Sequence, residues 1–402
     1  MGSAAETLCG QAYGAKQYDM LGVYMQRSWI ILFCTSIPML FLYIFANSIL
    51  RLIGQSPEIA ELAGKFSHWM IPQLFAFALN FPIQKFLQAQ SKIFAMAIIS
   101  FVGMVIHIFF SWLLIVKLGW GLGGGAIVLN ASWWFVVIAQ LVYIFSGTCG
   151  EAWSGFSIKA FQNLWGFVRL SVSSAVMVCL EMWYYSALLL FAGYLKNAEV
   201  AVSGFSVCFN ILCWVLSLAF GFNAAISVRV SNELGAGHPM KTKFAVIVVT
   251  LTTLIFGFLI ALVLMATRKQ YPAIFVDSKE VQHVVYELTP LLCGNIIINV
   301  LQPSLSGVAV GAGWQAYVVY VNIICYYVVG IPLGLILSYV LDMGIMGLFY
   351  GMTIGTMVQT FVLIWMMYKT DWNKEILIVE DRMREWGGET VKNTVNGHGI
   401  IS

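Results

Sequence analysis

Residues 176–185 read VMVCLEMWYY and place one carboxylate, Glu181, inside an apolar run. The run belongs to a longer stretch, residues 166–193, that is long enough to cross about 30 Å of hydrocarbon as a helix. Glu181 follows Arg169 by twelve residues, which is about 18 Å along a helix and puts it near the middle of a membrane. The stretch is therefore predicted to span a membrane, and the presence of a carboxylate within it requires an explanation.

The rest of the chain has the same character. Of its 402 residues, 60% are hydrophobic and 10% are charged, whereas soluble domains carry about 25% charged residues. The alternation with period two that is typical of membrane barrels is missing, so the backbone must satisfy its hydrogen bonds within helices. We predict an all-α polytopic membrane protein with ten spans, near 24–50, 66–90, 95–116, 122–146, 166–193, 202–227, 244–267, 284–311, 316–340 and 344–368.

The positive charges indicate an orientation. A net charge of +3 gives no support for a nucleic-acid partner. When the loops are assigned alternately to two sides, fourteen lysines and arginines fall on the side of the tail after Lys369 and seven on the other. Because these residues accumulate in cytoplasmic loops, we predict a cytoplasmic C-terminus.

Metal and enzyme chemistry find no support in the residue pattern. The eight cysteines lie mostly inside apolar stretches, without a CxxC pair or a histidine at ligand spacing, so we expect free thiols and no metal or cofactor. No combination of nucleophile, base and orienting residue is visible, and no enzyme activity is predicted.

The sequence contains an internal repeat. A shift of 222 residues lays QSPEIAELAG (55–64) on DSKEVQHVVY (277–286), and a shift of 221 lays GQAYGA (10–15) on SNELGA (231–236). Transporters are commonly built from such repeats. The second copy has two full helices before its GA loop, whereas the first has only residues 1–9 there. We therefore expect a parent architecture of six plus six helices, of which about ten are complete here.

The repeat suggests domain boundaries. Residues 1–150 would form an N-terminal lobe, incomplete at its start, and residues 166–368 a C-terminal lobe. Residues 151–165 would link the lobes on the cytoplasmic side, and residues 369–402 would form a cytoplasmic tail. An alternative start codon, a splice form or an incomplete gene model would each explain a late start.

Polar residues form stripes on several predicted helices. Polar residues that recur on one face of a membrane helix line either a helix contact or a water-filled cavity, and the convergence of several stripes favours a cavity. Asn210 belongs to a stripe on 202–227. The stripe on 284–311 is Asn295, Asn299, Gln302 and Ser306, and three of the four equivalent positions in the first copy are again amides, namely Gln73, Asn80 and Gln84.

Glu181 is the main candidate for a functional charge. An ionised carboxylate at mid-membrane is costly unless it is paired, protonated, bound to an ion or facing water. A role in joining helices would be served at lower cost by glutamine, so we predict a proton or cation site. Other charges have simpler explanations. Glu6 is expected at a solvated helix end, with a role in a cavity as the alternative, and Lys85 is expected to extend to the interface rather than to contact substrate. Arg229 is expected to pair with Glu233.

Several motifs resemble one family. ETLCGQAYGA (6–15), MVCLEMWYY (177–185), SVRVSNELGAGHP (227–239), LTPLLCG (288–294) and GVAVGAGWQ (307–315) are similar to motifs of plant multidrug and toxic compound extrusion (MATE) carriers. Residues 294–315 resemble the branch with vacuolar flavonoid and anthocyanin carriers. The resemblance implies twelve helices in two lobes, alternating access and proton-coupled antiport of organic solutes, with about the first two helices absent here.

The resemblance also implies roles for two positions. Glu181 matches the acidic residue that couples protons to transport, whereas Asn299 stands where many relatives carry a second acid. Glu181 would then carry the proton alone with Asn299 as a hydrogen-bond partner. The alternative is that this branch of the family transports its solute by a different mechanism.

We therefore expect a secondary active transporter, a proton-coupled antiporter that exports or sequesters flavonoid-like or xenobiotic solutes. Its partners would be protons, the organic substrate and the bilayer, and we expect a monomer in the vacuolar membrane, with the plasma membrane as the alternative. The aromatic residues that could stack on a flat substrate, although such residues also pack helices, are Trp183, Tyr184, Tyr185, Tyr326 and Tyr327. The alternatives are an anion channel or uniporter of the vacuolar membrane, which the neutral Asn299 would suit, and an inactive truncated form.

Overall fold

The computed structural model describes residues 2–194 and 198–386, and within these ranges all regular secondary structure is helical. This confirms the predicted all-α membrane fold. The first part contains α1 (Gly2–Gly14), α2 (Tyr18–Ile44), α3 (Ala46–Leu52), α4 (Pro57–Ala89), α5 (Ile93–Ser111) and α6 (Gly121–Tyr143). The second contains α7 (Leu164–Ala192), α8 (Ala198–Gly235), α9 (Pro239–Ala266), α10 (Pro272–Phe275), α11 (Lys279–Ala312), α12 (Gln315–Asn322), α13 (Ile331–Leu335), α14 (Gly344–Lys369) and α15 (Trp372–Glu385).

Nine helical segments of the described ranges are long and apolar enough to cross a membrane. The tenth predicted span, 66–90, lies in the 33-residue helix α4, which is not among the nine. Besides the amides Gln73, Asn80 and Gln84, α4 carries four charged residues, namely Glu58, Glu61, Lys65 and Lys85. The predicted span 316–340 is one continuous path, but π-helical turns interrupt it at Ile323–Gly330 (η5) and Ile336–Val340 (η6).

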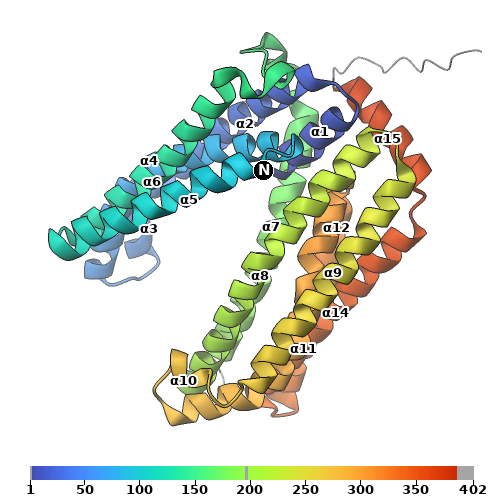
Figure 1. Ribbon diagram of the computed structural model, residues 1–402. Helices are drawn as coiled ribbons and strands as arrows, with labels where there is room; N and C mark the ends of the chain where they lie inside the picture. Colours follow the sequence, from blue (N-terminus) through green and yellow to red (C-terminus); the bar gives the residue numbers. More distant parts are fainter. Residues whose placement is uncertain (1, 195–197, 387–402) are drawn as a thin grey trace, which may run out of the picture.

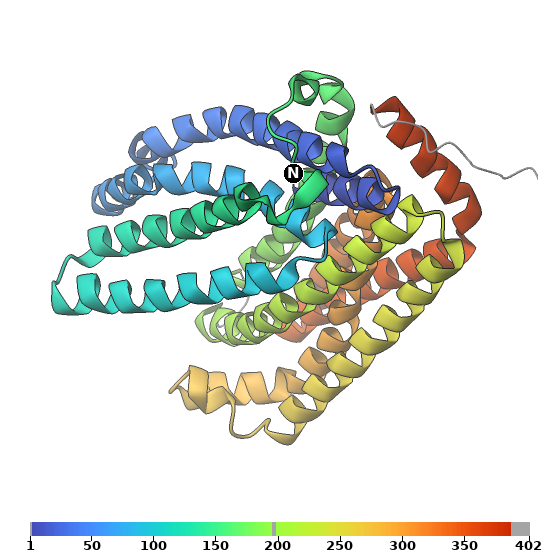
Figure 2. The same ribbon diagram turned by 45° about the horizontal axis from the view of Figure 1, so that its top comes forward.

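The helices form two groups arranged as a V (Figure 1). One group contains α1 to α6 and the other α7 to α14, and the groups converge at the end that carries α1 and α15. They diverge toward α3 and α10, as the view in Figure 2 also shows. Of the predicted tail after residue 368, the structure describes α15 as far as Glu385 and one further residue, Trp386; residues 387–402 lie outside the described ranges.

The internal repeat coincides with the observed helix ends. Helices α4 and α11 begin at Pro57 and Lys279, which are 222 residues apart, and they have 33 and 34 residues. Helices α1 and α8 end at Gly14 and Gly235, which are 221 residues apart. The two shifts found in the sequence therefore relate equivalent helices of the two groups.

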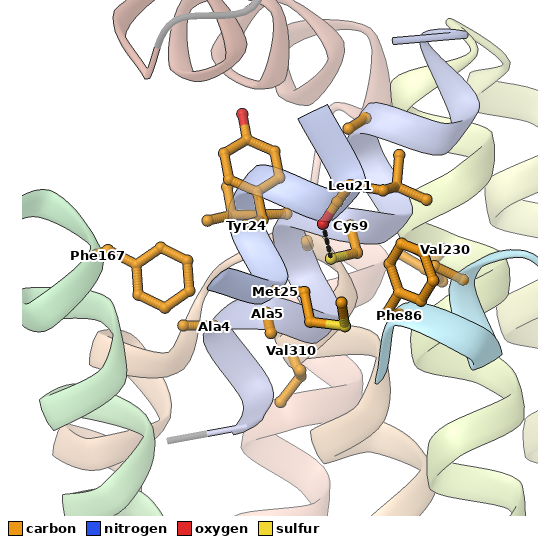
Figure 3. Close-up of a cluster of buried hydrophobic side chains, with 14 of the residues drawn as sticks. Ala4, Ala5, Cys9, Leu21, Tyr24, Met25, Phe86, Phe167, Val230 and Val310 are labelled. Carbon is orange, nitrogen blue, oxygen red and sulfur yellow. Dashed lines mark hydrogen bonds between the residues drawn. The ribbon is translucent and has the colours of Figure 1, made fainter. Parts of the chain in front are cut away.

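A hydrophobic core lies where the groups converge (Figure 3). Its fully buried side chains come from α1, α2 and α4 on one side and from α7, α8 and α11 on the other, and they include Ala4, Ala5, Cys9, Leu21, Tyr24, Met25, Phe86, Phe167, Val230 and Val310. The Cys9 thiol donates to the carbonyl of Leu21 at 3.8 Å. This end of the V is thus closed by apolar packing from both groups.

Glycines let the two groups touch through their backbones. A Cβ added at Gly14 would lie 2.0 Å from the carbonyl oxygen of Asn232, and one at Gly235 would lie 2.1 Å from that of Gln11. Both glycines belong to the repeated motifs GQAYGA and SNELGA. The small residues of the motif therefore permit the close crossing of α1 and α8.

Helix α15 ties the groups together at the same end. The guanidinium of Arg382 donates to the side-chain oxygen of Gln11 at 3.1 Å and to the carbonyl of Ala312 at 3.2 Å, one in each group. Arg27 of α2 donates to the carbonyl of Trp386 at 3.1 Å. Burial lowers the pKa of Arg382, and the nearby Glu375 carboxylate acts in the opposite direction.

Replacing Gly235 by alanine tests the close crossing. The added Cβ would meet the backbone of α1, so Gly235→Ala should lower the free energy of unfolding by about 1–3 kcal/mol. Gly221→Ala on the same helix is the control, because nothing lies within 4 Å of its added Cβ. Thermal unfolding in nanodiscs should show a lower midpoint for Gly235→Ala alone; equal midpoints would contradict the proposed contact.

Candidate functional site

Helix α7 turns Glu181 toward the interior of the second group. Its buried residues Ser171, Ser174, Met177, Tyr184 and Leu188 lie three, three, seven and four positions apart in turn, which are spacings of one helix face. Glu181 lies on this face between Met177 and Tyr184, and its side chain is half-buried. A carboxylate is thus placed on the packed side of an otherwise apolar helix.

The partners of Glu181 are uncharged. The Gln302 amide donates to its Oε1, and the same nitrogen donates to the hydroxyl of Ser306 at 3.1 Å. The Tyr326 hydroxyl of η5 is the second polar side-chain group that interacts with the carboxyl. None of the ion pairs among the described residues involves Glu181. The site therefore offers hydrogen bonds to the carboxyl group without a compensating positive charge.

Tyr326 is held in place by aromatic packing and by an altered helix register. It lies in the π-helical segment η5, which precedes Pro332 in α13; π-turns shift the side chains that follow and are frequent at functional sites. Its ring stacks on that of Tyr184, with centroids 4.4 Å apart and planes at 8°. The neighbouring Tyr327 donates from its hydroxyl to the carbonyl of Leu180 at 2.9 Å.

A chain of hydrogen bonds runs from Tyr326 into the core. Its hydroxyl donates to Oε1 of Gln359 at 2.6 Å, and Nε2 of Gln359 donates to Oδ1 of Asn322 at 2.7 Å. Asn322 donates in turn to the backbone carbonyl of Met177 at 3.4 Å. Tyr326, Gln359 and Asn322 are fully buried, so these bonds have no competition from bulk water.

A separate set of hydrogen bonds contains Asn299, which the resemblance matches to the position of the missing acid. The Tyr185 hydroxyl donates to Oδ1 of Asn299 at 2.8 Å, and the Asn299 amide nitrogen donates to both the carbonyl, at 3.0 Å, and the side-chain oxygen of Asn295. Asn295 donates to the hydroxyl of Thr353 at 3.1 Å. All polar atoms of Asn299 are therefore engaged, and its amide is neutral.

Glycines bring α14 against the helix that carries Tyr326. A Cβ on Gly351 would lie 2.3 Å from the Cα of Gly334, and one on Gly355 would lie 3.0 Å from the Cα of Gly330. Gly351 and Gly355 are four residues apart on α14, and Gly330 and Gly334 are four residues apart on the facing segment. This spacing is the small-xxx-small pattern of close membrane helix contacts. This contact places Gln359, one turn beyond Gly355, within reach of Tyr326.

The structure gathers only part of the predicted set. Around Glu181 it brings together Tyr185, Tyr326, Asn295, Asn299, Gln302 and Ser306. Asn210 is exposed on α8, and Trp183, whose side chain is 63% exposed, lies on another face of α7. Gln73, Asn80 and Gln84 lie on α4 in the other group, where Gln84 lines a separate pocket of about 340 Å³ with His107 and Ser132.

Sequence reasoning missed Gln359, Asn322 and Thr353. A signal was present, because Thr353, Thr356 and Gln359 recur at three-residue intervals on the last span, and the stripe argument applies to that helix too. Cysteine, histidine and acidic residues form no group of three or more able to hold a metal within the described ranges.

Two expectations for the other charges were wrong, and one is confirmed. Glu6 is only 4% exposed and pairs with Lys85 at 2.8 Å, so Glu6 is not solvated and Lys85 does not extend to the interface. Helices α1 and α4 pack together, and no other ionic partner of these two charges is found among the described residues. Arg229 pairs with Glu233 at 2.7 Å, as predicted.

Comparison with known proteins identifies the family. The MatE family profile matches residues 1–113 and 173–336. Protein DETOXIFICATION 29 of Arabidopsis thaliana is 60% identical over 398 residues, which cover 98% of this chain and 80% of the relative. Protein DETOXIFICATION 30 of the same plant is 59% identical over 396 residues, with the same coverage.

Solved structures agree with this. The eukaryotic MATE transporter AtDTX14 superposes with a TM-score of 0.88 at 37% identity, over 95% of this chain and 85% of that chain. An outward-facing MATE transporter of the MOP superfamily, at 17% identity, shares the fold with a TM-score of 0.79 over 94% and 84% of the two chains. The chain belongs to the MATE family of transporters.

Proposed function

We propose that the protein is a proton-coupled antiporter that exchanges protons for organic solutes by alternating access, with Glu181 as the proton site. The observation that carries this proposal is the environment of Glu181. A carboxyl group on a membrane-spanning helix has amide and phenol partners and no ionic partner among the described residues. A protonated carboxyl keeps its hydrogen bonds without burying a charge, and release of the proton creates one.

Protonation of Glu181 can change the packing of three helices. The carboxyl belongs to α7, while Gln302 belongs to α11 and Tyr326 to η5. Gain or loss of the proton therefore alters bonds between these elements. Since a ligand shifts a conformational equilibrium only through its different affinity for the two states, proton and substrate should favour opposite states.

The two helix groups would be the moving parts. We infer that residues 1–150 and 166–368 act as lobes joined by residues 151–165, with the C-terminal tail in the cytoplasm. The end of the V that diverges toward α3 and α10 then faces the lumen or the outside (Figure 1). Opening to the cytoplasm would require separation of the glycine crossing of α1 and α8 and release of the bonds of Arg382 to one of the lobes.

The substrate is proposed to be a flat organic solute of the flavonoid, anthocyanin or xenobiotic kind. Tyr184 and Tyr326 stack on each other, which leaves them no free face for a ligand on that side. The exposed polar side chains of Asn210 and Ser217 on α8 are better placed to meet solute. The vacuolar membrane is the proposed location, where an acidic lumen would supply protons.

Substitution of Glu181 tests the proton site. Glu181→Gln keeps the hydrogen-bond partners but has no titratable proton, so uptake of a flavonoid driven by a pH gradient in proteoliposomes should be lost. Glu61→Gln is the control, because Glu61 is an exposed acid that pairs only with Lys65 at the surface. Gradient-driven uptake that survives in Glu181→Gln would eliminate the proposed proton site.

Electrical recording separates the antiporter from an anion channel. In patch-clamp of vacuoles that contain the protein, we expect small currents that saturate with substrate and depend on pH. The amides of Asn299 and Gln302 donate to protein partners, so they are not free to bind a passing halide. Large halide currents without organic substrate would instead identify a channel.

A further inference from the structure

The hydrogen-bond chain behind Glu181 has a fixed direction. It ends on the backbone carbonyl of Met177, which can only accept a hydrogen bond. Asn322 must therefore present its NH₂ group there and its oxygen to Gln359. Gln359 must in turn present its NH₂ group to Asn322, which leaves its oxygen to accept from the Tyr326 hydroxyl.

This direction determines what Tyr326 can offer to Glu181. A tyrosine hydroxyl has one proton to donate and two lone pairs that accept. The single proton of Tyr326 is used by Gln359, so only its lone pairs remain for the carboxyl group. A protonated Glu181 can donate to them, whereas a carboxylate cannot.

We propose that Gln359 and Asn322 are positioning residues that hold the Tyr326 hydroxyl in the direction that suits the protonated form of Glu181. The inference rests on the proposed function of Glu181 and adds the device by which its protonation would reach α12 and α14. Of the three residues in this hydrogen-bond chain, Tyr326 is the one beside the carboxyl. Gln359 and Asn322 therefore act on Glu181 through Tyr326.

Release of the proton has a defined consequence. The O–H bond of the Glu181 carboxyl breaks, its electron pair stays on the carboxylate, and the proton passes to water. The Tyr326 hydroxyl then rotates, keeping its own proton, to donate to the carboxylate. Gln359 loses its donor and is left with a buried oxygen that has no partner, which is unfavourable. The Gln359 amide can regain a partner only if α14 or the α12–η5 segment moves.

No other titratable group near Glu181 explains such a linkage as directly. Among the described residues, the phenols of Tyr184 and Tyr185 lie on its own helix. The phenol of Tyr326 and the thiol of Cys325 lie on η5, and the Cys213 thiol of α8 lies near Tyr185. Helix α11 faces the carboxyl with Gln302 and Ser306, and α14 contributes Gln359 and Thr353 to the network; none of these four titrates.

The inference is tested by Gln359→Met, a substitution of similar volume without an acceptor. The Tyr326 proton would become free to donate to the Glu181 carboxylate, which stabilises the deprotonated form. The pH midpoint of gradient-driven transport should therefore move to lower pH by about one to two units. The infrared band of the protonated carboxyl, assigned by its loss in Glu181→Gln, should titrate with the same shift in the reconstituted protein.

Further variants separate this effect from a loss of packing. Asn322→Leu should also lower the midpoint, because Gln359 is then free to turn its NH₂ group toward Tyr326. Thr360→Val on the same helix is the control, since its hydroxyl bonds only to the Thr356 carbonyl. The double variant Tyr326→Phe with Gln359→Met should have the same pH midpoint as Tyr326→Phe alone. Without the Tyr326 hydroxyl, the Gln359 substitution has no hydrogen-bond donor to redirect.

The possible failures are distinguishable. If gradient-driven transport is unchanged in Glu181→Gln, Glu181 is not the proton site. If Glu181 is required but Gln359→Met and Asn322→Leu leave the carboxyl titration unchanged, or move it to higher pH, the positioning role is overturned. An equal shift from Thr360→Val, or an additive effect of Gln359→Met in the Tyr326→Phe background, would also overturn it.

Discussion

A carboxyl group within a membrane bundle constrains everything around it. Glu181 has no ionic partner among the described residues, so its charge must be avoided or stabilised by uncharged donors. The protein supplies the Gln302 amide as a donor and places the Tyr326 hydroxyl beside the carboxyl, from two different helices. Each of these is committed to further partners, Ser306 in one case and Gln359 in the other. A single proton is thus connected to the packing of four helices.

The packing that makes this possible depends on glycine. The Gly351–Gly334 and Gly355–Gly330 contacts bring α14 close enough for Gln359 to reach Tyr326. At the closed end of the V, Gly14 and Gly235 allow α1 and α8 to cross. Close contacts of this kind fit one arrangement well and resist intermediate ones, which suits a protein that alternates between two states.

The sequence was sufficient for the fold class, the repeat and the choice of Glu181. Lipid imposes strong rules on composition and helix length, and a repeated helix start at Pro57 and Lys279 is visible as a fixed shift. The stripe on α11 was also readable because polar residues are rare there. Which stripes meet was not readable: Asn210 and Gln73 have the same pattern as Asn299, but Asn210 is exposed and Gln73 lies on α4 in the other group. The contact of Gln359 with Tyr326 and the Glu6–Lys85 ion pair depend on how helices pack. The spacing of residues along the sequence does not reveal this packing.

The central claim is that the Glu181 proton and the organic substrate are linked. Linkage of two ligands is reciprocal, so substrate binding must release protons from Glu181 when it is protonated. The most direct measurement is the proton release that follows addition of a flavonoid to the purified protein in weakly buffered solution, read with a pH-sensitive dye. The account predicts release by the native protein and none by Glu181→Gln at equal substrate binding. Equal proton release by the two proteins, or none by either while substrate binds, would contradict it.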